Sequence, residues 1–188
     1  LFFANERDIA EEAWPGDIIG IPNHGTLRIG DTLTEGEDLR FRGVPAFAPE
    51  LLQKVRLDDP LKGKHLQRAL EQLAEEGASQ VFKPMMGADW IVGVVGQLQF
   101  EVLKERIAAE YGIKVHFEQT PAYAARWVMG DDPLEIKKFR DSNQSALFED
   151  HDDTLVFIAR NAWHLETTQR DWPNLKFEST REQNMVAA

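Results

Sequence analysis

Two glycines in the segment VGVVGQLQF (residues 92–100) mark the first place where this sequence could support chemistry. Gly93 and Gly96 follow a run of apolar residues and precede a helical pattern, and backbone N–H groups at such a turn can bind a phosphate. A dinucleotide fingerprint needs a G-x-G-x-x-G spacing, however, and a P-loop needs Lys followed by Ser or Thr; the segment has neither. We therefore expect these glycines to let a helix and a strand pack closely.

The other residue types that carry chemistry are scattered along the chain. The five histidines show no metal-ligand spacing, no serine lies in a G-x-S-x-G elbow, and there is no cysteine. The acidic segment EDHDD (149–153) lacks the glycine and the distal glutamate of a calcium loop, so we expect a solvated hairpin turn. The sequence therefore predicts no catalytic, cofactor-binding or metal-binding residue, and no enzyme activity for this chain.

A basic window stands out against an acidic background. Residues 51–70 carry five basic side chains and two acidic ones, a local charge of +3, whereas the whole chain has a net charge of −11. Such a focused patch can contact RNA phosphates while the rest of the surface repels nonspecific attachment. An ordinary solvated surface is the alternative. We expect the five side chains to converge on one surface as candidate RNA contacts: Lys54, Arg56, Lys62, Lys64 and Arg68.

Length and composition limit the class of protein. A chain of 188 residues with 43% hydrophobic residues can build one domain or two small ones with a proper core. The absence of cysteine fits a reducing cytoplasm, and no apolar run approaches the ~20 residues of a membrane span. The start LFFANERD carries charges too early for a signal sequence. Because the sequence begins with Leu and not Met, we expect the natural protein to extend further toward its N-terminus.

The elements that must position these residues begin with a β-rich segment. Residues 1–42 contain GDIIGI, GTLRIG and DTLTEG, short β-prone pieces separated by turn residues. They predict the tail of an antiparallel β-barrel domain whose earlier strands lie upstream. Unpaired edges of such a barrel could support self-association between copies. The proline-containing segment 42–50 is expected to be an interdomain connection.

Residues 43–120 follow a strand, helix, strand, strand, helix, strand order. Strands are expected at 51–57, 78–83, 89–95 and 113–118, because apolar and polar residues alternate or form short apolar runs there. Asp59 and Pro60 open a helix that ends near Gly77, and a second helix runs from about residue 97 to Gly112. This order is typical of a split βαβ, ferredoxin-like unit.

Residues 121–188 repeat the order. Strands are expected at 122–129, 145–149, 154–159 and 175–179, with helices opened by Asp132 and by Asn161. The predicted fold class is therefore α+β, with two ferredoxin-like units after a partial β-barrel.

With this organisation in place, the sequence resembles the peptide chain release factor 3 family, the translational GTPases of bacterial termination. The resemblance runs through nearly the whole chain and is most specific in EEGASQVF and VGVVGQLQFEVL. It is carried by the segments PGDIIGIPNHGTLRIGDTLTEGE, FAPELLQKVRLDDPLKGKHLQRALEQLAEEGASQVFKP, IVGVVGQLQFEVLKERIAAEYGIKV, ARWV and TRE.

The resemblance implies a GTP-binding domain, then a β-barrel, then a C-terminal α/β domain, of which this chain holds the end of the barrel and the C-terminal domain. GTP or GDP and Mg would belong to the absent N-terminal domain. The implied partners are the ribosome, through rRNA and ribosomal proteins, and indirectly the release factors that read stop codons; the implied location is the cytoplasm. A regulatory module that binds a small metabolite between its two units is the alternative, and an acylphosphatase-like enzyme ranks third.

Overall fold

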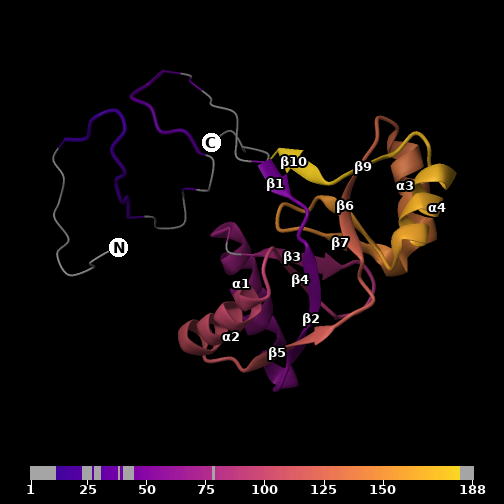
Figure 1. Cartoon of the computed structure of the whole chain (residues 1–188), viewed down its shortest axis with the longest axis horizontal. Coiled ribbons are helices and arrows are strands. Elements are labelled where there is room, and N and C mark those ends of the chain that lie inside the picture. The colour runs from indigo at the N-terminus through magenta and orange to yellow at the C-terminus, as the bar shows by residue number, and fades with distance from the viewer. Residues whose placement is uncertain are drawn as a thin grey trace.

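The computed structural model describes residues 12–22, 27, 31–37, 39, 45–77 and 79–182. Its centre is an eight-stranded sheet in the order β5-β2-β4-β3-β7-β8-β6-β9, in which every neighbouring pair is antiparallel. Four helices cover this sheet: α1 and α2 lie on one side of the molecule, and α3 and α4 lie on the opposite side (Figure 1). The predicted α+β fold is confirmed.

The first half of the sheet has the predicted element order. Asp59 accepts a hydrogen bond from the backbone N–H of Leu61 (3.0 Å) and so caps the turn that leads into α1, while Gly112 ends α2 in the left-handed conformation with φ 64°. The elements are β2 (Leu51–Leu57), a 3-10 turn (Pro60–Lys62), α1 (Gly63–Glu75), β3 (Gln80–Pro84), β4 (Ile91–Val94), α2 (Leu98–Tyr111) and β5 (Val115–Gln119).

The second half repeats this arrangement. Asp132 and Asn161 cap α3 and α4 through their side chains, as predicted. In both halves the spatial order of the strands is fourth, first, third, second, and the second strands, β3 and β7, join the halves. The elements are β6 (Ala124–Met129), α3 (Pro133–Asn143), a 3-10 turn (Gln144–Ala146), β7 (Leu147–Glu149), β8 (Leu155–Ala159), α4 (Ala162–Asp171) and β9 (Lys176–Glu178).

Alternation along the strands divides the core into three clusters. One cluster lies between the first half and its helices, and another between the second half and its helices. The third contains residues of both halves, so the sheet face away from each helix pair packs against the other half. Its members are Leu52, Phe82, Ile91, Ala125, Trp127, Phe148, Val156 and Ile158. The layers are therefore helix, sheet, sheet, helix.

Two expectations for the N-terminal part need correction. Segment 42–50 is not a plain connection, because Pro45–Phe47 forms a strand, β1, that pairs antiparallel with β10 (Thr180–Glu182). GDIIGI and DTLTEG form no strand in the described part of the chain, where Ile18 is 97% exposed. A strand needs a neighbour for its hydrogen bonds, and no described element supplies one. GTLRIG lies almost wholly outside the described residues, and self-association through barrel edges stays a prediction.

Within the described ranges, no helix is long and apolar enough to cross a membrane.

Candidate nucleic-acid interface

Lys54 and Arg56 lie on the face of β2 that points away from α1. On this strand Leu51, Val55 and Leu57 contact the core under the helices, so residues 54 and 56 project to the other side. There Lys54 pairs with Asp89, and Arg56 bonds to Asp89 (2.9 Å) and Glu118 (2.8 Å).

These pairs belong to a row of alternating charges along the paired strands β2 and β5. His116, opposite Arg56 in the register, lies 3.1 Å from Asp58 and 3.4 Å from Glu118. The hydrogen bond with Arg56 lowers the pKa of Glu118, and the same bond raises the pKa of Arg56. Because the carboxylates offset the cations, this row is a poor phosphate site. The five predicted contacts therefore do not converge on one surface.

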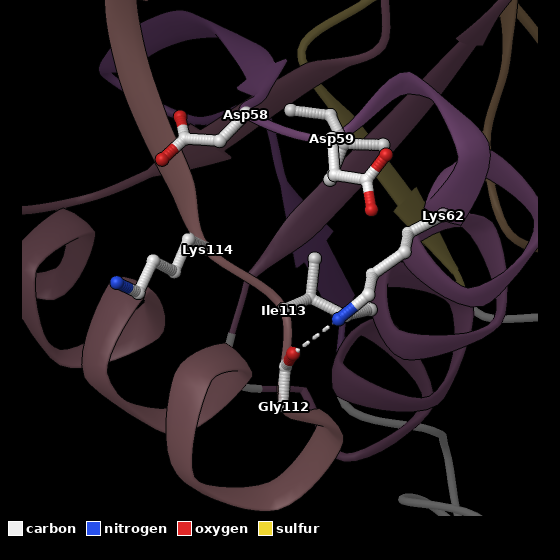
Figure 2. Close-up of a pocket in the computed structure, with 7 residues that line it drawn as sticks. Asp58, Asp59, Lys62, Gly112, Ile113 and Lys114 are labelled. Carbon is white, nitrogen blue, oxygen red and sulfur yellow. Dashed lines mark hydrogen bonds between the residues drawn. The ribbon is translucent and has the colours of Figure 1, made fainter.

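Lys62 is exposed but makes a hydrogen bond within the chain. Its Nζ donates a hydrogen bond of 2.9 Å to the carbonyl of Gly112, just beyond the C-terminus of α2 (Figure 2). A cation there is favoured by the partial negative charge of the helix end. The bond crosses a shallow depression of about 190 Å³, and Lys114 lies on the other side of Gly112 from Lys62 (Figure 2). The depression is lined by Leu57, Asp58, Asp59, Lys62, Gly112, Ile113 and Lys114.

Lys64 and Arg68 are the members of the basic window that remain available. They lie one turn apart on α1, both are exposed, and neither forms an ion pair with a described residue. The first turn of α1 holds no acidic residue, which is the reverse of what the positive N-terminal end of a helix dipole favours. We name Lys64 and Arg68 the α1 basic patch. Lys114 lines the same depression as Lys62 and is a further cation. It lies outside the basic window 51–70 because it follows α2, a later helix in the sequence.

The turn between β4 and α2 offers no free N–H groups at Val95 and Gly96 for a phosphate. Its backbone N–H groups at Val95 and Gly96 both donate to the side-chain oxygen of Gln99, at 2.8 and 2.9 Å. Close packing is required at Gly93, where a Cβ would lie 2.3 Å from Pro49, but not at Gly96, where the space is open. The packing prediction therefore holds for Gly93 with a different partner, Pro49 instead of the helix, and is wrong for Gly96.

Replacing Gln99 with leucine is expected to lower the free energy of unfolding by about 0.5–2 kcal/mol, because two N–H groups at the start of α2 lose their acceptor. Urea denaturation monitored by circular dichroism measures this. Gln97→Leu, one helical position before α2, is the control, since the side chain of Gln97 makes no capping hydrogen bond. Equal losses for the two variants would contradict a capping role for Gln99.

The acidic segment 149–153 is the predicted hairpin turn, between β7 and β8, but it is only partly solvated: Asp153 is exposed, whereas Asp150 is buried. Asp150 is 8% exposed; its side chain accepts hydrogen bonds from the backbone of Asp152 (3.0 Å) and Thr154 (2.9 Å) and from the indole of Trp127 (2.8 Å). Arg181 of β10 completes the group with ion pairs to Asp150 and Asp152 and a bond to Thr154. Sequence spacing gave no sign of this partner, because Arg181 lies far along the chain.

Across the described part of the chain, no three His, Asp or Glu side chains come together in a way that could hold a metal ion.

Comparison with protein-family models relates this chain to translation factors. Residues 1–36 match the model of elongation factor G domain 2, and residues 41–169 match the model of the class II release factor RF3, C-terminal domain. Because the second match spans more than half of the chain, this chain belongs to the RF3 C-terminal domain family. The chain is thus part of a factor related to the translational GTPases. The proposed boundaries at 42 and 120 remain predictions.

Proposed function

We propose that this chain is the ribosome-docking, C-terminal portion of a translation termination factor that acts in the cytoplasm. The whole factor would use GTP hydrolysis in a separate nucleotide domain, which would hold GTP or GDP and Mg, to promote removal of stop-codon-reading release factors after the peptide has left. This portion would contribute contacts and no chemical step. Family membership and the α1 basic patch together support the proposal.

The position of the patch is the observation that carries the RNA contact. Lys64 lies in the first turn of α1, where a positive charge costs helix stability. Lys64 and Arg68 are exposed on this helix, and a phosphate-binding surface requires Lys or Arg. The alternative, a metabolite bound between the two units, has no support in the described residues, since that space is filled by side chains such as Phe82, Trp127 and Val156.

Lys64→Glu combined with Arg68→Glu is expected to weaken association with ribosomes and to reduce its salt dependence, by about two units of the log–log slope for two phosphate contacts. The Lys64→Glu change alone is expected to raise the free energy of unfolding by about 0.3–1 kcal/mol, because an acid replaces a base near a helix N-terminus. Sedimentation with purified ribosomes over a salt series and urea denaturation measure the two effects.

The matched control is Lys137→Glu with Lys138→Glu, which reverses two exposed charges on α3. It should leave ribosome association within experimental error of the unchanged chain. If the α1 and α3 variants weaken association equally, net charge explains the effect and the α1 contact is wrong. Failure of the unchanged chain to sediment with ribosomes even at low salt would contradict docking by this portion.

A further inference from the structure

The outer face of α2 carries large apolar side chains that the fold does not use. Leu98 and Val102 are 79% and 58% exposed, and Val95, in the turn before the helix, is 68% exposed. The side chains of α2 that enter the core are Phe100, Leu103 and Ile107. Because successive helix residues are rotated by about 100°, Leu98 and Val102 point away from the side that holds Ile107. We name Val95, Leu98 and Val102 the α2 stripe.

The neighbouring helix shows what a solvated outer face looks like here. The exposed residues along α1 include the charged Lys64, Arg68 and Glu75, whereas Glu71 is half-buried and bonded to Gln67. The α2 stripe therefore differs from the outer face of α1. Grouped apolar side chains on an exposed face mark interaction sites far more often than single ones do.

Acidic side chains flank the stripe. Glu101 and Glu105 are exposed, lie on the outer side of α2, and form no ion pair with a described residue. Arg106, in contrast, is already bonded to Glu76 (2.8 Å) and Glu110 (2.7 Å), and both bonds raise its pKa. Lys104 is also exposed and lies one helical turn from Glu101, so a single cation borders the two carboxylates. The stripe with its flank is therefore apolar and negatively charged.

We propose that the α2 stripe docks a basic amphipathic helix of a partner protein. The apolar side of such a helix would cover Leu98, Val102 and Val95, and its Lys or Arg side chains would pair with Glu101 and Glu105. RNA does not fit this face, because the two carboxylates repel phosphates. The proposal rests on the proposed function in one respect: the partner is expected among the proteins of the ribosome. In this scheme α2 contacts a protein, whereas α1 contacts RNA.

The test uses a fluorescent peptide of about 14 residues, or four helical turns, with leucines on one face and lysines elsewhere. A scrambled peptide of the same composition has the same charge but no apolar face. Fluorescence anisotropy with the whole chain should show a preference for the patterned peptide of about tenfold, the effect expected of burying one or two aliphatic side chains. Leu98→Ser with Val102→Ser should remove the preference. Glu101→Lys combined with Glu105→Lys should weaken the binding of both peptides.

Leu134→Ser is the matched control, since Leu134 is 67% exposed on the first turn of α3. It should retain the preference, and circular dichroism should show that all variants are folded. The proposal is overturned if the stripe variant keeps the preference, if the control also loses it, or if the unchanged chain binds both peptides equally. Because the assay contains no ribosome, it stands apart from the sedimentation experiment: a retained peptide preference with no ribosome binding contradicts the docking function alone.

Discussion

Arg181→Ala is expected to lower the free energy of unfolding by about 3–5 kcal/mol, because it leaves two carboxylates without their buried cation. The side chain of Arg181 is 3% exposed, and those of Asp150 and Asp152 are 6% and 14% exposed. The guanidinium carbon also lies 6.0 Å from the centre of the Trp127 ring. Urea denaturation monitored by circular dichroism measures the loss.

Arg170→Ala is the control for this prediction. The guanidinium of Arg170 lies 3.3 Å from Asp171, and its side chain is 75% exposed, so the change should stay within about 0.5 kcal/mol. Hydrogen exchange is a second readout. Because Arg181 belongs to β10, which pairs with β1, exchange at Ala46 and Phe47 and in the turn 150–153 should accelerate first. A loss of less than about 1 kcal/mol in the free energy of unfolding would mean that water replaces the guanidinium and that the ion pair does not stabilise the fold.

Phe139→Ala is expected to lower the free energy of unfolding by about 3–5 kcal/mol, because it opens a cavity at a fully buried aromatic site. The ring of Phe139 is 0% exposed and meets the rings of Phe157, Trp172 and Phe177 at centroid distances of 6.1, 5.2 and 5.6 Å. Leu134→Ala on the same helix removes an exposed side chain and should change stability by less than about 0.5 kcal/mol.

The same variant tests whether the two halves unfold together. The cluster between the sheets joins Leu52, Phe82 and Ile91 of the first half to Trp127 and Val156 of the second. A defect under α3 should therefore lower protection from hydrogen exchange in β2 and α1 as much as in β8, with one cooperative transition in urea. If only the second half loses protection, the halves are independent units and the shared cluster contributes little to cooperativity.

Local signals in the sequence determined the elements and their order. Asp59 with Pro60, Asp132 with Pro133, and Asn161 are helix caps whose chemistry depends on neighbours two or three residues away. Gly112 ends α2 for the equally local reason that it tolerates a left-handed backbone. The order of the elements then favoured the ferredoxin-like arrangement, and the family resemblance, carried by continuous segments, was confirmed by the family match over residues 41–169.

Tertiary structure alone decided which charges are available. Lys54 and Arg56 stand beside Lys62 in the sequence, yet they face Asp89 and Glu118 on the other side of the sheet, whereas Lys64 and Arg68 remain exposed on α1. The acidic turn 150–153 looked solvated because its cation, Arg181, comes from a strand about thirty residues later. Caps and turns act over a few residues and can be predicted from them; ion pairs across a sheet depend on register and layer packing, which many distant residues set together.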